Sequence, residues 1–412
     1  MDSCTIDGFG PLALVRPKSV AELSEVVHGA AAEGSALYPV GGRTQLGLGN
    51  PPIRAGFAVG LRGLDRVADF QPRDMTITAQ SGITIARLQA LLAAENLRLP
   101  IDVPQGDRAT LGGIVATNPS GPRRYGCGTL RDYVIGISAV NDEGREFKAG
   151  GRVVKNVAGY DLCKLLIGSL GTLGIITQVT LKLRPLPEEQ ALISLGCEVQ
   201  RLDGLLEALH GTRTRPVCID LLNRPAAVAV FRRAGCDVPH GAWTAVVGYE
   251  GNEEAVRWQV QQLIVEVSAA SGLEARVGFT AKPLWDALTE GAAGEAAVTF
   301  KANMLPSTVA AFCQAVDGDS NQPALQAHVG NGIVIGSWPD ELTEQRTLEL
   351  RTDWCERVAR GQGVVVVERC PPSWKRTVPV WDAVPDGWLM RAVKDRFDRG
   401  RIFNPGRFVE GI

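Results

Sequence analysis

The chain has 412 residues, 45% of them hydrophobic, and a formal net charge of −2 at pH 7. This length supports two or three packed domains. The mixed charges exclude a basic stripe for nucleic acid, and no apolar run approaches the 18 residues of a membrane-spanning helix. The nine cysteines form no C-x-x-C pair, which argues against disulfides, iron–sulfur clusters and structural zinc. With no signal-peptide pattern at the amino terminus, we expect a cytoplasmic protein.

The first elements are a helix, a strand and a glycine loop. Ser19 and Glu22 form a capping box at the start of a helix that Gly34 ends. The apolar strand 36–40 follows and leads directly into the glycine-rich loop 41–49. A strand that leads into such a loop is a favourable arrangement for an anion site.

The remainder of the first region mixes strands and helices. Residues 75–82 alternate as a strand, and 84–97 have the apolar spacing of a helix. Residues 134–150 read as two strands joined by a turn. A β-branched run over 174–187 ends in two prolines, which suggest a domain boundary near residue 187.

Beyond that boundary, short, partly alternating strands are interspersed with amphipathic helices near 253–270, 307–316 and 340–360. This pattern fits an antiparallel sheet with helices on one face. We therefore expect a first domain over 1–187, a second over 188–375 and a carboxy-terminal segment, 376–412.

Three glycine clusters lie in the first domain, at 39–47, 109–121 and 168–174. Backbone N–H groups of the first two could hold the phosphates of a dinucleotide, and the apolar third suits a flat ring. A single glycine cluster is more often a turn than a ligand site. No G-x-G-x-x-G or P-loop pattern is present, so the pattern alone leaves the cofactor open.

Four stretches make the resemblance specific: "YPVGGRTQLGLG", "LPIDVPQGDRATLGGIVATNPSGPRRYGCGTLRDYVIG", "GGRVVKNVAGYDLCKLLIGSLGTLGIITQVTLKLRP" and "RIFNPGR". They resemble, in this order, the FAD-binding domain of the vanillyl-alcohol-oxidase family, also called the PCMH type. Within the family they are most similar to the FAD-binding subunit of glycolate oxidase. The resemblance implies an α+β fold: a PCMH-type FAD-binding domain of two small α+β subdomains, plus an α+β cap domain with an antiparallel sheet.

The resemblance also implies which residues hold FAD. The first loop, with Arg43 as its cation, would hold the pyrophosphate, the second would complete the cradle, and the carboxy-terminal segment would return to the flavin. Lys155 would either touch FAD or pair with a carboxylate. The implied FAD-binding residues are Val40, Gly41, Gly42, Arg43, Thr44, Gln45, Thr110, Gly112, Gly113, Thr117, Gly121, Gly126, Gly174, Ile176, Asn404 and Arg407. Since 41–49 contain no histidine, the FAD should be non-covalent.

The cap domain departs from the family pattern. Catalytic relatives carry a metal-binding set resembling H-A-G-D-G-N-L-H and a later E-H-G, whereas this chain has "HVGNGIVI" and "ERC". His328 is kept, but Asn331, Ile335 and Arg369 replace an acid and two histidines, so we expect no metal. His328 is a candidate base and Lys301 and Arg369 are candidate carboxylate anchors. The alternatives are a structural histidine and solvated surface cations.

We expect an FAD-containing subunit of a glycolate-oxidase-like complex, a flavin oxidoreductase acting on the CH–OH group of a small 2-hydroxy acid such as glycolate or D-lactate. The resemblance implies a sister flavoprotein subunit and an iron–sulfur subunit, through which the chain could lie at the inner membrane. A structural or electron-relay subunit without substrate chemistry is the alternative, and a stand-alone oxidase that uses O₂ is a third hypothesis.

Overall fold

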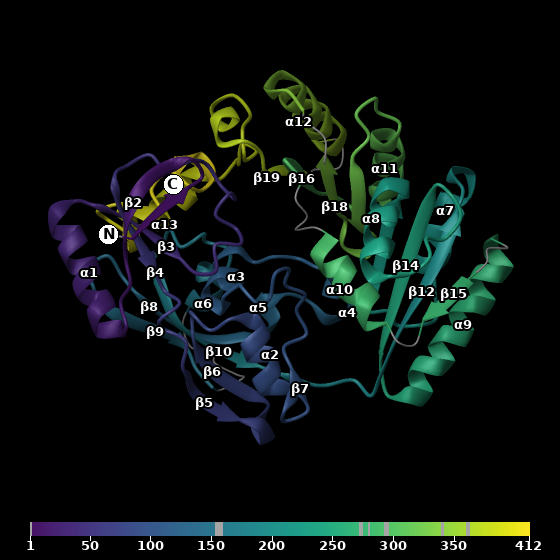
Figure 1. Ribbon diagram of the computed structural model, residues 1–412, viewed down its shortest axis with the longest axis horizontal. Helices are drawn as coiled ribbons and strands as arrows, with labels where there is room; N and C mark the ends of the chain where they lie inside the picture. The colour runs from purple at the N-terminus through teal and green to yellow at the C-terminus, as the bar shows by residue number, and fades with distance from the viewer. Residues whose placement is uncertain are drawn as a thin grey trace. The chain divides into compact units, whose positions relative to one another are not determined.

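The computed structural model describes residues 2–152, 160–271, 275–278, 281–291, 296–338, 342–359 and 363–412. Lys155 and the neighbouring part of its motif lie outside these residues. The chain divides into two compact units (Figure 1). Unit 1 comprises Met1–Pro119, Thr129–Leu186 and Val380–Ile412, and unit 2 comprises Ser120–Gly128 and Pro187–Pro379. The sequence predicted that residues 120–128 belong to the first domain, whereas in the structure they are part of unit 2.

The amino-terminal part of unit 1 is built on a four-stranded sheet of order β1-β2-β4-β3. The strands are β1 (Ser3–Ile6), β2 (Phe9–Val15), β3 (Ala36–Val40) and β4 (Gly56–Gly60). Helix α1 (Val20–Glu33) packs its buried residues against this sheet. The capping box is confirmed, because Ser19 Oγ accepts from Glu22 N at 3.1 Å, and Gly34 ends the helix with φ 68°.

A second sheet of unit 1 has five antiparallel strands in the order β5-β6-β10-β8-β9. They are β5 (Val67–Gln71), β6 (Thr76–Gln80), β8 (Val134–Val140), β9 (Glu146–Gly150) and β10 (Ile175–Lys182). Its apolar core also takes residues from helices α2 (Ile85–Ala93), α3 (Leu111–Thr117), α5 (Leu130–Tyr133) and α6 (Leu162–Leu166). The short strands β7 (Leu97–Arg98) and β11 (Arg184–Pro185) pair with each other. This arrangement confirms the α+β class.

The carboxy-terminal segment returns to unit 1 through helix α13 (Gly387–Phe397). Val393 and Phe397 pack against the core of the five-stranded sheet. Beyond the helix, Leu37 N donates to Ile402 O at 2.7 Å and Asn404 N donates to Leu37 O at 2.9 Å, so residues 402–404 lie beside β3.

Unit 2 contains an antiparallel eight-stranded sheet of order β15-β12-β14-β13-β17-β18-β16-β19. The strands are β12 (Glu189–Cys197), β13 (Cys218–Asn223), β14 (Trp243–Gly251), β15 (Ala275–Gly278), β16 (Val298–Asn303), β17 (Ala324–His328), β18 (Ile333–Trp338) and β19 (Val364–Arg369). The short helix α4 (Arg124–Cys127) of segment 120–128 packs near β13, where Gly126 N donates to Val217 O.

Helices cover both faces of this sheet, which corrects the expectation of helices on one face. One core joins the sheet to α7 (Leu202–His210), α9 (Glu253–Ser271), α11 (Val309–Asp317) and α12 (Glu344–Ala359). Another joins the opposite face to α8 (Arg224–Ala234) and α10 (Lys282–Gly291). Neighbouring residues such as Leu221 and Leu222 are both buried, so the central strands are apolar on both sides and require two layers.

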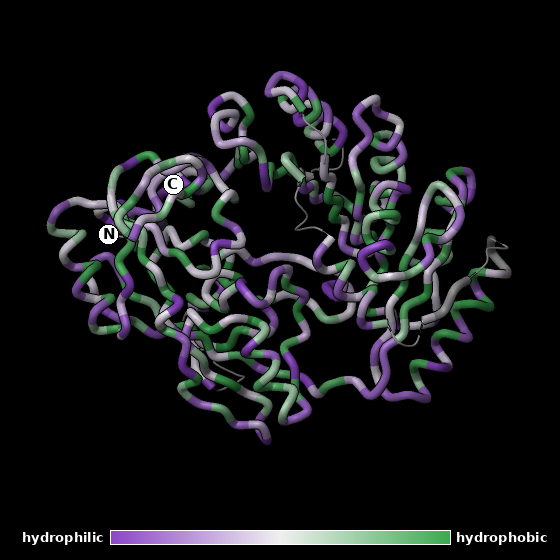
Figure 2. Tube along the Cα trace, in the orientation of Figure 1, coloured by the Kyte–Doolittle hydropathy of each residue, from purple (hydrophilic) through white to green (hydrophobic). Residues whose placement is uncertain are grey.

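The surface helices follow the expected amphipathic pattern. Figure 2 shows hydrophilic and hydrophobic residues alternating along α9, and Val256, Val260 and Leu263 of that helix enter the core. Within the described residues, no helix combines the length and the apolarity that a membrane span requires.

Candidate functional site

The loop after β3 has two glycines, Gly41 and Gly42, that lie very close to neighbouring residues. A Cβ on Gly41 would lie 2.1 Å from Thr110 Oγ1, and one on Gly42 would lie 1.8 Å from Arg108 O. The backbone carbonyl of Arg108 excludes a side chain at Gly42, whereas a side chain at Gly41 would require the Thr110 hydroxyl to move. The loop 41–45 is thereby held against the start of α3.

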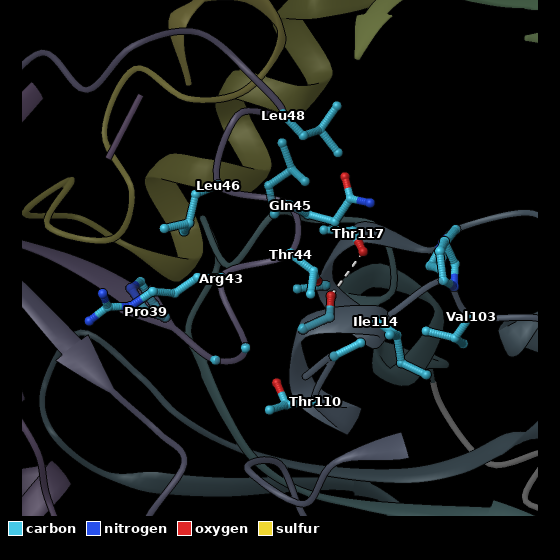
Figure 3. A pocket seen from close by; sticks show the side chains of 18 of the residues that line it. Pro39, Arg43, Thr44, Gln45, Leu46, Leu48, Val103, Thr110, Ile114 and Thr117 are labelled. Atoms are coloured by element: carbon cyan, nitrogen blue, oxygen red, sulfur yellow. Dashed lines mark hydrogen bonds between the residues drawn. The ribbon is translucent and has the colours of Figure 1, made fainter. Parts of the chain in front are cut away.

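The same loop presents unused hydrogen-bond donors. Within the described part of the chain, the backbone N–H groups of residues 41–44 donate to no other group. Arg43 has φ 60°, a left-handed conformation, and successive N–H groups around such a residue form an anion-binding concavity. In Figure 3 the Arg43 side chain extends away from Thr44 and Thr117, so the backbone is the better candidate for anion contact.

A cavity opens beside this loop, and the space in it, open solvent included, is about 820 Å³. A second cavity of about 430 Å³ shares part of its wall. The predicted residues that line one or both are Gly41, Gly42, Arg43, Thr44, Gln45, Thr110, Gly112, Gly113, Thr117, Gly174, Ile176, Asn404 and Arg407. The two cavities together bring most of the predicted FAD-binding residues to one region of unit 1.

Ser81 is a polar lining residue that the sequence interpretation missed. It lines the second cavity, is 1% exposed, and its buried Oγ has no hydrogen-bond partner among the described residues. A Cβ on Gly112 would lie 2.6 Å from Ser81 Cβ, so that glycine makes room for the serine. An unpaired buried hydroxyl is costly and fits a ligand that supplies a partner. The available signal was its place after the strand "MTITAQ".

The third glycine cluster has a conformational cause. Gly168, Gly171 and Gly174 have φ values of 80°, 66° and 152°, which side chains rarely adopt. Asn404 Nδ2 donates to Leu170 O at 2.6 Å and therefore fixes this turn to the carboxy-terminal segment. Two of these glycines, Gly171 and Gly174, line the second cavity.

Arg407 binds protein rather than projecting freely into the cavity. Its guanidinium donates to Asn50 O, Leu46 O and Leu48 O, each at 2.6 Å, and pairs with Asp7 at 3.3 Å. Burial lowers the pKa of Arg407, and the Asp7 carboxylate opposes that shift. Arg407 therefore closes the first glycine loop over the carboxy-terminal segment.

Three predicted FAD-binding residues do not line either cavity. Val40 is buried at the end of β3, whereas Gly121 and Gly126 belong to unit 2. A Cβ on Gly126 would lie 2.6 Å from Val217 Cα. The glycine at that position is therefore explained by packing within unit 2.

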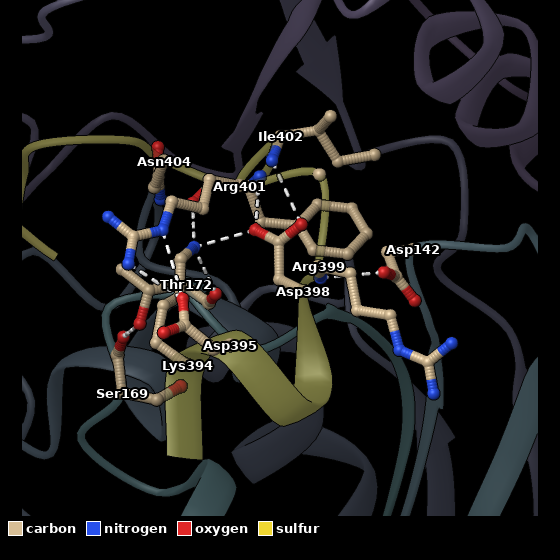
Figure 4. A network of polar contacts seen from close by, with 12 residues as sticks. Asp142, Ser169, Thr172, Lys394, Asp395, Asp398, Arg399, Arg401, Ile402 and Asn404 are labelled. Atoms are coloured by element: carbon tan, nitrogen blue, oxygen red, sulfur yellow. Dashed lines mark hydrogen bonds and ion pairs between the residues drawn. The ribbon is translucent and has the colours of Figure 1, made fainter. Parts of the chain in front are cut away.

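A second polar network joins α13 to the glycine turn (Figure 4). Lys394 Nζ pairs with Asp398 at 2.6 Å and donates to Thr172 O at 2.7 Å and Phe403 O at 2.8 Å. Both charged side chains are almost fully buried. This network connects a helix, a cavity-wall turn and the segment that carries Asn404.

In unit 2, His328 ends β17 and is 2% exposed. Its Nδ1 lies 2.7 Å from Asp220 Oδ1, while its buried Nε2 has no partner among the described residues. The buried Asn331 Oδ1 likewise has no partner there. Sequence reasoning identified His328 but missed Asp220, because their contact spans 108 positions.

The two candidate cations lie on neighbouring strands. Lys301 of β16 pairs with Glu368 at 3.0 Å, and Arg369 of β19 is opposite Thr299 of β16 and donates to Ala296 O at 3.4 Å. Cross-strand register puts Lys301, Ile335 and Gln326 in one row, and alternation places His328 on the same face. The described residues hold no group of three metal-ligating side chains, and the absence of metal stays a prediction.

Comparison with known proteins identifies the first region. Residues 11–150 match the family model "FAD binding domain". The chain is 31% identical over 236 residues to glycolate oxidase subunit GlcE of Escherichia coli, covering 57% of this chain and 62% of that one. It is 26% identical to glycolate oxidase subunit GlcD of Bacillus subtilis, in an alignment that covers 96% of this chain and 88% of that one. It is 35% identical to a Xanthomonas citri D-2-hydroxyglutarate dehydrogenase, in an alignment that covers 45% of this chain and 40% of that one.

Solved structures share the architecture. A 4-ethylphenol oxidase from Gulosibacter chungangensis superposes with a TM-score of 0.74 at 15% identity, covering 98% of this chain and 90% of that one. An alkyldihydroxyacetonephosphate synthase superposes with a TM-score of 0.70 at 17% identity, covering 96% of this chain and 77% of that one. At these identities the likeness concerns the fold. The glycine-lined cavity and the matched region together assign residues 11–150 to the FAD-binding domain family of the PCMH type.

Proposed function

We propose that the chain is an FAD-containing subunit of a 2-hydroxy acid dehydrogenase complex of the glycolate oxidase kind. It would pass electrons from a small 2-hydroxy acid, such as glycolate or D-lactate, to a partner subunit. The observation that carries the proposal is the cavity beside the free N–H groups of 41–44, within an FAD binding domain. The relatives named glycolate oxidase subunits support the substrate class and the complex.

In this proposal the free N–H groups of 41–44 bind the pyrophosphate of a non-covalent FAD, and Ser81 donates to a polar group farther along it. Arg407 keeps the first loop closed, and Asn404 fixes the apolar glycine turn. The bound flavin would supply the acceptor for a hydride from the substrate. Val40, Gly121 and Gly126 would support the fold rather than touch FAD.

On the substrate side, His328 is the candidate base, and Lys301 and Arg369 are the candidate anchors for the substrate carboxylate. Glu368 already balances the charge of Lys301, so the lysine would have to exchange partners. Arg369 presents a fork of donors suited to a carboxylate. Arg369 would also exchange a protein partner, since it donates to Ala296 O, and we favour it as the anchor for the geometry of its donors alone.

The second candidate function is a structural or electron-relay subunit without substrate chemistry. The Lys301–Glu368 pair favours it, because a compensated cation attracts a carboxylate less strongly. A sister flavoprotein subunit would then oxidise the substrate, and an iron–sulfur subunit would take the electrons.

Anaerobic flavin reduction by the purified chain separates the two functions. Bleaching within seconds on addition of glycolate or D-lactate, with Arg369→Ala raising the half-saturating concentration about tenfold (about 1.4 kcal/mol), supports substrate oxidation by this chain. Bleaching only after addition of a sister flavoprotein subunit supports the relay function. A colourless chain that takes up no FAD contradicts both.

A further inference from the structure

Asp220 and His328 form a buried pair across two neighbouring strands of unit 2. They are direct cross-strand partners of β13 and β17, with exposed fractions of 0% and 2%. The distance between Asp220 Oδ1 and His328 Nδ1 is 2.7 Å. The pairing of β13 with β17 therefore fixes the position of both residues inside unit 2.

Gln326 fixes the orientation of the carboxylate. Its Nε2 donates to Asp220 Oδ2 at 2.8 Å and to Leu288 O of α10 at 3.0 Å. Both oxygens of Asp220 are thus engaged, one by the glutamine and one by the histidine. The buried carboxylate has little freedom to rotate away from the imidazole.

This arrangement determines which imidazole nitrogen carries the proton. An ionised carboxylate accepts hydrogen bonds, so it favours a proton on His328 Nδ1 and leaves a lone pair on Nε2. That Nε2 is buried and has no partner among the described residues, a state that is unfavourable for a buried acceptor. A ligand hydroxyl would satisfy this acceptor.

The geometry points to Asp220 as the positioning residue that holds His328 in the Nδ1–H tautomer, which leaves Nε2 as an acceptor for the hydroxyl of a 2-hydroxy acid. This inference rests on the proposed function for the identity of the alcohol. In the proposed function Nε2 would take the hydroxyl proton, and the flavin, when bound, would supply the acceptor for the hydride, so that the 2-hydroxy acid becomes a 2-oxo acid. Gln326 contributes by holding the carboxylate.

Asp220→Asn tests the tautomer without relying on turnover. Its amide oxygen can still accept from Gln326, while its amide N–H can donate to Nδ1 and move the histidine proton to Nε2. The chain has four histidines, all in described residues, and His328 alone is buried. ¹⁵N-histidine NMR of the FAD-loaded chain at pH 8, assigned with His328→Gln, should show an unprotonated Nε2 in the wild type and a protonated Nε2 in the variant.

Flavin reduction supplies the second readout. Asp220→Asn should slow reduction by a 2-hydroxy acid by roughly 100-fold or more, with half-saturating concentration, FAD content and melting temperature nearly unchanged. Asp317→Asn is the matched control, since Asp317 contacts Asn223 and Gln322 and not His328.

A wild-type Nε2 that carries a proton at pH 8 overturns the inference, even if Asp220→Asn fails to fold. An unchanged tautomer or an unchanged reduction rate in a folded Asp220→Asn chain overturns it equally. If the wild type is not reduced by any 2-hydroxy acid while the tautomer switches as expected, the proposed function fails and the positioning role of Asp220 stands.

Discussion

Gly42 and Gly47 lie in the same loop, yet a side chain would meet different surroundings at each. A Cβ on Gly42 would overlap Arg108 O, whereas one on Gly47 would meet no atom within 4 Å. We expect Gly42→Ala to weaken FAD binding at least about tenfold and Gly47→Ala to change it less than threefold. Titration of the apoprotein with FAD measures both, and equal effects of the two variants would contradict a backbone cradle.

At Arg407 the expected effect is on stability as well as on the cofactor. Arg407→Met removes a buried ion pair and three hydrogen bonds to the loop, and breaking a buried pair costs about 3–5 kcal/mol. Arg145→Ala is the control, because its ion pair with Glu143 is exposed and should contribute under about 1 kcal/mol. Denaturant unfolding measures the difference; similar losses in both variants would contradict a structural role for Arg407.

Some residues of the site could be predicted from the sequence and others could not. The paired glycines at 41–42 and 112–113 indicate, from the sequence alone, that another part of the chain or a ligand packs closely against the backbone there. Asp220 could not be found in this way, since its role depends on strand register with His328. Arg407 carries a motif signal, but the sequence does not reveal that carbonyls of 46–50 occupy its donors.

At the scale of elements, α13 secures the glycine turn through Lys394. Lys394→Met removes the ion pair with Asp398 and the donors to Thr172 O and Phe403 O. We expect a loss of about 3–5 kcal/mol and faster hydrogen exchange at residues 170–172. Arg396→Ala, an exposed position of the same helix, should stay within about 0.5 kcal/mol. Unchanged exchange in Lys394→Met would show that the turn holds without the helix.

Elements with strong local signals could be predicted from the sequence. The capping box and Gly34 bound α1, and the β-branched run contains β10. Segment 120–128 could not be placed, because its membership of unit 2 depends on the packing of Gly126 against Val217 and of Tyr125 against Gly330. The sequence did not predict the second helical layer of unit 2. A short strand that is apolar on both faces has the same sequence pattern as any buried apolar segment, so it does not show that helices cover both faces of the sheet.

At the scale of the whole molecule, FAD should stabilise one unit selectively. Both cavities are lined by unit 1 residues, so FAD at about 100 times its Kd should stabilise that unit by about 2.7 kcal/mol. Calorimetry with and without FAD should show its transition rise by about 5–10 °C, while that of unit 2 stays within 1 °C. Equal shifts of both transitions would contradict a site confined to unit 1.

The return of Val380–Ile412 to unit 1 has a consequence for biosynthesis. A ribosome releases the matched region 11–150 long before it reaches Asn404 and Arg407, which complete the cavity wall. Domains that fold during synthesis do so as their own residues emerge, but this cavity wall is complete only after Asn404 and Arg407 have been synthesised. FAD binding should therefore follow the synthesis of Asn404 and Arg407, and a translation product that stops before them should keep the matched region yet bind no FAD.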